Sequence, residues 1–126
     1  MDAALKGTVL PVLRDCGFKG SFPHFRRFTS NSVDLLTFQF DKWGGGFVVE
    51  IASGSIDGFT THWGEHIPAK KLTAHNLHPS CRVRIQPIDG GGTDAWFRFD
   101  DGNVTRAAQE FLARFPIAEA WLQEQA

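Results

Sequence analysis

Four of the five histidines in this 126-residue sequence, and one of its two cysteines, fall within residues 60–81. His62 and His66 are four residues apart, as on one turn of a helix, and Glu65 lies beside them. Zinc takes imidazole and thiolate ligands in tetrahedral sites at short spacings. The candidate ligands are His62, His66, His75, His78 and Cys81. Three of them would leave a position for water, with Glu65 as its base, which would make the chain a metal-dependent hydrolase.

Two features of the same segment argue for a simpler interpretation. Its histidines and glutamate do not follow the His-Glu-x-x-His order of a metalloprotease helix, and no Cys-x-x-Cys pair accompanies them. Cys81 also alternates with Val83 and Ile85, which predicts that its side chain points into the core. We therefore favour a polar loop with solvated histidines and no cofactor, and keep zinc as the alternative.

A second set of chemically capable side chains alternates with apolar residues near the C-terminus. If Val83, Ile85 and Phe97 point inward, the other face carries Arg82, Arg84, Gln86, Trp96 and Arg98. Neighbouring strands would add Thr37, Gln39 and Glu50 to this face. Guanidinium groups hold carboxylate or phosphate in a fork, and Trp stacks on ligands. For the face itself we favour an ordinary solvated sheet face with Arg–Glu pairs between strands. The alternative, a binding surface for a protein partner or a small anionic ligand, is the strongest functional signal in the chain, and we prefer it to an enzyme.

A third group, Lys19, Arg26 and Arg27, is interleaved with phenylalanines. Basic and aromatic residues together can contact RNA by charge and stacking. The simpler interpretation is a basic edge strand that resists pairing with another sheet. The net charge of −1 and the isoelectric point near 6.5 argue against a nucleic-acid binder, because phosphate neutralisation needs clustered excess Lys and Arg.

Apolar periodicity predicts the elements that position these residues. A helix over 3–16 places Leu5, Val9, Val12, Leu13 and Cys16 on one stripe. Gly17 would end it as a left-handed cap, with Phe18 folding back onto the last turn. Pro11 either kinks this helix or lies in the first turn of a helix that starts later, capped by Thr8.

Strands are predicted from aromatic and β-branched runs. "SFPHFRRF" reads as an edge strand because Pro23 cannot donate to a ladder, and it would form an antiparallel meander with "VDLLTFQF" and "FVVEIAS". "CRVRIQP" and "AWFRFD" follow as two further strands. Between them and the meander, periodicity is lost over about 54–80, which predicts a long irregular loop of the kind that is often functional.

The C-terminal part is predicted to be helical. Asn103 is a good N-cap for an amphipathic helix carrying Phe111 and Phe115, and Pro116 would begin a last short helix with Ile117, Ala120 and Trp121. The fold class is therefore α+β, with residues 1–126 forming one domain. We expect a two-layer sandwich: a five-stranded, mainly antiparallel sheet with the N-terminal helix and the C-terminal helices on one face.

Composition narrows the class of protein further. The apolar share of 42% suits a globular chain, and no run approaches the length of a membrane span. Two cysteines do not make a disulfide framework, so we expect a reducing, cytoplasmic compartment and no membrane contact. The composition predicts neither the oligomeric state nor the identity of the ligand.

The segments "LPVLRDCGFKG", "FRRF", "FQF", "SCRVRI" and "WFRFDD" together resemble a bacterial family, domain of unknown function 4304 (DUF4304). The resemblance rests on Gly17, Phe18, Lys19, Gln39, Cys81, Arg84 and Trp96. It covers most of the chain outside 54–80 and implies an α+β fold. It supplies no activity, cofactor or catalytic residue.

Overall fold

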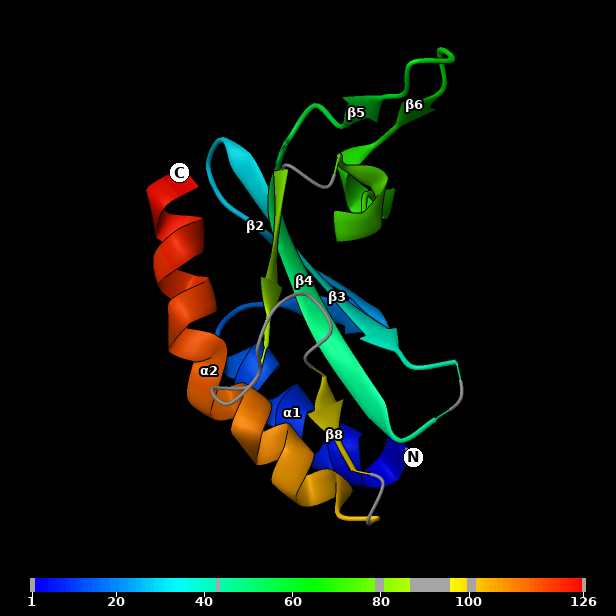
Figure 1. Ribbon diagram of the computed structural model, residues 1–126. Coiled ribbons are helices and arrows are strands. Elements are labelled where there is room, and N and C mark those ends of the chain that lie inside the picture. The colour runs from blue at the N-terminus through cyan, green and yellow to red at the C-terminus, as the bar shows by residue number, and fades with distance from the viewer. Residues whose placement is uncertain (1, 43, 79–80, 87–95, 100–101, 126) are drawn as a thin grey trace.

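The computed structural model describes residues 2–42, 44–78, 81–86, 96–99 and 102–125. The elements are α1 (Asp2–Asp15), β1 (Lys19–Ser21), β2 (His24–Phe28), β3 (Ser32–Phe40), β4 (Gly46–Ser55), β5 (Phe59–Thr60), β6 (His66–Ile67), 3₁₀ turns η1 (Ala69–Lys71) and η2 (Ala74–Asn76), β7 (Arg82–Ile85), β8 (Phe97–Arg98) and α2 (Val104–Gln125). Both α-helices lie on one side of the main sheet, while the β5–β6 hairpin and the 3₁₀ turns lie toward its other side (Figure 1). The predicted α+β class is confirmed.

The main sheet is antiparallel and has the strand order β1-β2-β3-β4-β7, with β8 also paired to β4. β7 pairs with β4 over Val49–Ala52, and β8 pairs with it at Gly46 and Phe47, so β7 and β8 follow each other along one edge of β4. The predicted meander is confirmed for β2, β3 and β4. The single predicted edge strand is instead two strands, β1 and β2, because Pro23 lies in the turn between them.

The main core lies between the sheet and the two helices. Its buried members include Leu5, Val9, Leu13, Phe18, Phe38, Phe47, Ile85, Phe97, Phe111 and Phe115. α1 ends as predicted: Gly17 has a φ of 92°, and the amide of Phe18 donates to the carbonyl of Leu13 over 2.9 Å. Phe18 then packs edge-on against Phe115, which joins the end of α1 to α2.

The C-terminal helix differs from the prediction, because α2 runs without a break through Pro116. The residues that follow the proline continue the buried stripe at Ala118 and Leu122, while Ile117 is exposed. This burial offsets the hydrogen bond that the proline cannot make. α1 likewise continues through Pro11 to the fully buried Leu13. The predicted N-cap is confirmed, since the amide of Arg106 donates to Asn103 Oδ1 over 3.0 Å.

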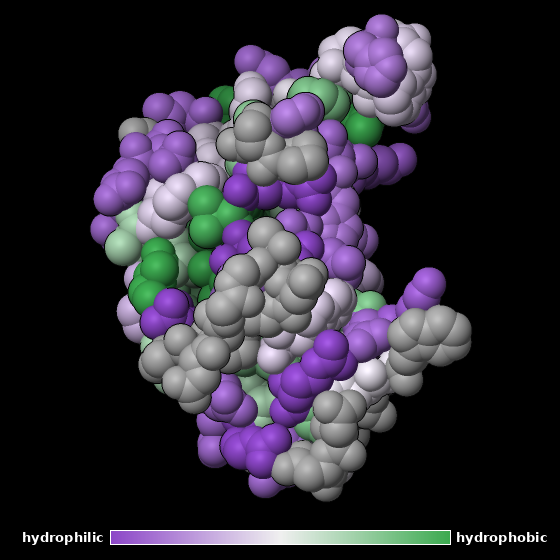
Figure 2. Space-filling model, in the orientation of Figure 1, coloured by the Kyte–Doolittle hydropathy of each residue, from purple (hydrophilic) through white to green (hydrophobic). Residues whose placement is uncertain are grey.

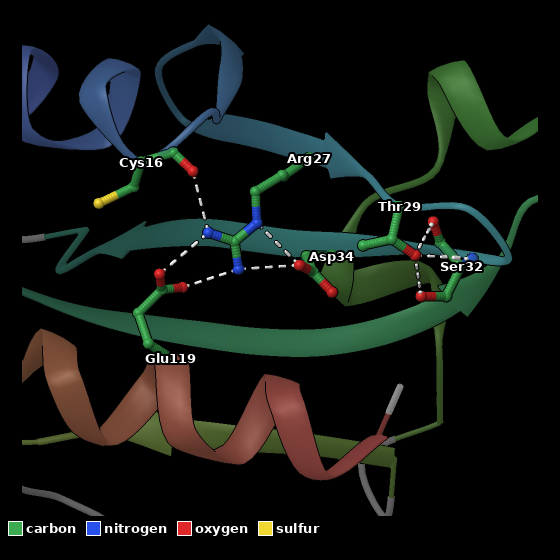
Figure 3. Close-up of polar contacts among 6 residues, drawn as sticks. All are labelled: Cys16, Arg27, Thr29, Ser32, Asp34 and Glu119. Atoms are coloured by element: carbon green, nitrogen blue, oxygen red, sulfur yellow. Dashed lines mark hydrogen bonds and ion pairs between the residues drawn. The ribbon is translucent and has the colours of Figure 1, made fainter.

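An ion network around Arg27 ties both helices to the sheet (Figure 3). The guanidinium donates to Asp34 over 2.9 Å and forms two hydrogen bonds with Glu119, of 2.7 and 3.0 Å. It also donates to the carbonyl of Cys16 and lies 4.4 Å from the centre of the Phe18 ring. The Asp34 side chain is only 6% exposed, so the Arg27 guanidinium compensates the loss of solvent around this carboxylate.

The other face of the sheet carries a second, smaller apolar cluster. It consists of Val33, Leu35, Ala52, Ala69, Leu72, Ala74 and Leu77. Four of its members come from residues 69–77 and pack on the three that come from β3 and β4. The segment predicted to be an irregular loop therefore contains short 3₁₀ turns and a strand pair, and it packs on the sheet. Leu72 is fully buried and lies so close to Gly54 that a Cβ atom there would meet its Cδ2 at 2.8 Å. None of the described helices is long and apolar enough to cross a bilayer.

Candidate functional site

The alternation predicted for the late strands holds. Ile85 and Phe97 lie in the main core, whereas Arg84 and Trp96 do not. In the sheet register Arg84 is opposite Glu50, Glu50 opposite Thr37, and Thr37 opposite His24, so one row of polar side chains crosses the face away from the helices. The surface is hollowed between the β5–β6 hairpin and the turn that joins β3 to β4, and hydrophilic residues predominate along this hollow (Figure 2).

Glu50 lies at the centre of this row. Its carboxylate pairs with arginines that were predicted to bind a ligand. Its Oε1 accepts a hydrogen bond of 2.7 Å from Arg82 and lies 2.9 Å from Nε2 of His75. Its other oxygen lies 3.8 Å from Nε of Arg84. The Glu50 side chain is 11% exposed rather than solvated, because the 3₁₀ turn η2 covers it with His75. The face is therefore held together by Arg–Glu pairs.

The predicted surface also divides into two groups. Arg98 pairs with Gly46 on β4, and Arg84 pairs with Glu50, which places them four residues apart, or about 13 Å. The Arg98 guanidinium donates to Asp41 over 2.7 Å and lies 5.6 Å from the centre of the Trp96 ring. Gln39 and Gln86 are half-buried. Both groups of arginines thus have a carboxylate of the chain itself beside them.

His24 was not among the predicted site residues, although the register places it in the same row. Its Nδ1 lies 3.1 Å from Oγ1 of Thr37, a hydroxyl that also accepts a hydrogen bond from the amide of Ala74. Burial lowers the pKa of His24, and the charges of His75 and Arg26 lower it further. The sequence signal that could have placed His24 in this row is strand alternation: its neighbour Phe25 is buried, so His24 points to the opposite face.

The five candidate zinc ligands are all described, and they are dispersed. The His62 ring packs on Trp63, His66 bonds to Thr60, and His75 lies on Glu50. Across the described ranges, no three His, Cys, Asp or Glu side chains are grouped so that they could hold a metal ion. The predicted inward orientation of Cys81 is wrong. Its side chain is exposed, because β7 begins only at Arg82 and Cys81 lies in the turn before it.

A cavity of about 430 Å³ lies at the β1–β2 end of the sheet. It is lined by Gly17, Lys19, Gly20, Arg26, Phe28 and Lys70, which we call the basic pocket. The turn after α1 leads into β1, the β1–β2 register sets Lys19 opposite Arg26, and η1 brings Lys70 from the other side. Three cations therefore line one cavity, and none of the described residues in its lining is acidic.

Within the part of the chain that the structure describes, the cations of the basic pocket lack the carboxylate partners that Arg27, Arg82 and Arg98 have. The side chains of Lys19 and Lys70 form no ion pair with any residue that the structure describes. Among the described residues Arg26 donates only to the carbonyl of Leu72, over 2.6 Å, and burial lowers the pKa of its guanidinium. A half-buried cation without a counter-charge is stabilised by any anion that reaches it. This arrangement can hold a small anionic group.

The sequence indicated Lys19, Arg26 and Arg27 as a basic edge strand or, in the alternative, as RNA contacts, and not as the lining of a pocket. Alternation from Phe25 separates the two arginines, because Arg27 points to the helix side and Arg26 to the opposite side. Nothing in the sequence connects Lys70 with them, since it lies more than forty residues further along the chain, in a segment without periodicity.

Comparison with known proteins gives one match. A family model described as a domain of unknown function (DUF4304) matches residues 9–124, and this range includes the segment 54–80. No curated protein and no solved structure matches the chain significantly. Since the family model spans nearly all of the sequence, the chain belongs to the DUF4304 family.

Proposed function

We propose that this protein is a small binding module for an anionic ligand, and that the ligand binds in the basic pocket. The observation that carries the proposal is the sorting of the cations. Arg27, Arg82 and Arg98 each pair with a carboxylate of the chain, whereas Lys19, Arg26 and Lys70 converge on one cavity without any. The predicted Arg/Trp face is a weaker candidate, because Glu50 and Asp41 already occupy its guanidinium groups.

The charge pattern favours a compact anion over a nucleic acid. A nucleic acid releases many counterions and needs cations along an extended track. The basic pocket instead concentrates three cations around one cavity on a chain whose net charge is −1. An Arg fork between two lysines suits a phosphate or carboxylate group, and charge-assisted hydrogen bonds of this kind are the strong ones.

The test is a calorimetric titration of the full chain with inorganic phosphate at constant, low ionic strength. We expect Arg26→Ala and Lys19→Ala each to weaken phosphate binding about tenfold, which corresponds to about 1.4 kcal/mol. Lys19→Ala guards against a folding defect, because its exposed side chain forms no ion pair with the described residues. Circular dichroism and thermal unfolding of each variant confirm that it folds.

Arg84→Ala is the matched control on the predicted Arg/Trp face, since it also removes one cation from the sheet. Phosphate affinity is expected to stay within twofold of wild type in this variant. Weaker phosphate binding by Arg84→Ala, with wild-type affinity in Arg26→Ala and Lys19→Ala, would show that phosphate binds on the Arg/Trp face instead. Absence of phosphate binding in all four proteins would refute the proposal.

A further inference from the structure

Phe28 is the one apolar side chain among the described residues that line the basic pocket, and it is 56% exposed. It forms no ring contact with any described residue, although twelve phenylalanines give the core many such pairs. An exposed ring face beside cations can stack on a planar group of a ligand whose charged part those cations hold. The pocket therefore offers a ring face as well as charge.

Strand geometry sets the distance between the charged side chain of Arg26 and the ring of Phe28. Arg26 and Phe28 are two residues apart on β2, so they lie on the same face of the sheet and about 7 Å apart along it. Lys19 lies directly opposite Arg26 on β1, so these two cations are level with each other and Phe28 lies two residues further along β2. A sugar spans such a distance between a phosphate and a base.

The number of cations favours a phosphate monoester over a carboxylate. A terminal phosphate has three acceptor oxygens, one for each of Lys19, Arg26 and Lys70, whereas a carboxylate has two. Gly17 and Gly20 line the cavity without side chains, which leaves room for a planar group to approach the backbone. The volume of about 430 Å³ falls in the usual range for small-molecule sites.

Building on the proposed anion-binding function, we infer that the ligand of the basic pocket is a mononucleotide-like molecule: its phosphate lies among Lys19, Arg26 and Lys70, and its planar base stacks on Phe28. Stacking of a base on an aromatic side chain is largely independent of which base it is. The inference therefore names a ligand class and not a particular nucleotide.

Four probes separate the two parts of the ligand: adenosine 5′-monophosphate, ribose 5-phosphate, inorganic phosphate and adenosine, each titrated calorimetrically into the full chain. The nucleotide is expected to bind about tenfold or more tighter than ribose 5-phosphate, and adenosine alone more weakly than the nucleotide. Phe28→Ala should lower nucleotide affinity to that of ribose 5-phosphate and leave phosphate affinity unchanged. Phe28→Trp should retain the preference for the nucleotide.

Ile117→Ala is the matched control, because it removes another exposed apolar side chain, one that lies on α2 and is not among the residues lining the pocket. It should change none of the four affinities. If phosphate binds and the nucleotide binds no tighter, or if Phe28→Ala weakens both equally, the inference about the base is overturned while anion binding stands. If adenosine binds as tightly as the nucleotide, the phosphate contributes nothing and the inference also fails. Absence of binding by all four probes would end both proposals.

Discussion

Arg26 and Arg27 are neighbours on β2, yet the sheet directs their guanidinium groups to opposite faces with opposite surroundings. Arg27 is held by Asp34, by both oxygens of Glu119 and by the carbonyl of Cys16. Arg26 has one partner among the described residues, the carbonyl of Leu72, and it lines an open cavity. The comparison separates two uses of the same side chain. A paired arginine fastens elements together, and one without a counter-charge is available to a ligand.

The largest expected effect is on the Arg27 side. Arg27→Ala should lower the free energy of unfolding by about 3 kcal/mol, because it leaves Asp34 nearly buried without its cation and breaks the link to α2. Urea denaturation measures the loss. Arg26→Ala is the matched control and should cost less than about 1 kcal/mol. Equal destabilisation by both variants would contradict the division between a structural and a ligand-binding arginine.

The second prediction concerns the segment that supplies the far wall of the basic pocket. Leu72→Ala should lower the free energy of unfolding by about 2 kcal/mol, since it empties the centre of the small apolar cluster. Its carbonyl anchors Arg26 and Lys70 lies two residues away, so phosphate affinity should fall as well.

Hydrogen exchange gives the sharper measurement for Leu72→Ala. Amides of residues 66–77 should exchange faster than in wild type, while those of β3 and α1 keep their relative protection. Leu36→Ala is the control in the main core, and it should accelerate exchange across the sheet and both helices. Uniform acceleration by Leu72→Ala would show that the two clusters are one cooperative unit.

The smallest expected effect is the pH dependence that His24 brings to the polar row. Burial lowers the pKa of His24 in the folded chain. As the pH falls, this imidazole is therefore protonated at a higher pH in the unfolded chain than in the folded one. This contribution to stability is complete above about pH 6.5 and is lost as the pH falls below that value. His24→Gln should reduce the loss seen in urea titrations between about pH 7 and 5. The exposed His62→Gln is the control, and an identical pH profile in both variants would contradict the assignment.

Much of the fold follows from the sequence because it depends on local periodicity. Alternation in β3 and β4 predicted which residues enter the main core, and the caps at Gly17 and Asn103 marked where helices end and begin. The continuation of α2 through Pro116 was not predictable in this way. It depends on burial of Ala118 and Leu122 against elements that are distant in the sequence.

The site was less predictable, because its chemistry depends on contacts between distant segments. Sequence alternation correctly placed Arg84 and Glu50 on one face, and it left two interpretations of the arginines open: pairing with Glu50 or binding a ligand. The structure shows the pairs. The basic pocket includes Lys70 from η1. The sequence of residues 66–78 has no apolar periodicity, so it did not predict where this segment packs on the sheet. A count of arginines therefore identifies candidates, and only the positions of the carboxylates distinguish them.

The most direct test of anion binding is the phosphate affinity of two adjacent lysine variants, Lys70→Ala and Lys71→Ala. Both residues are exposed and lie in η1, so each variant loses one charge from the same short turn. Only Lys70 lines the cavity. Calorimetry should give about a tenfold loss for Lys70→Ala and less than a twofold change for Lys71→Ala. Equal affinities in the two variants would contradict a ligand held in the basic pocket.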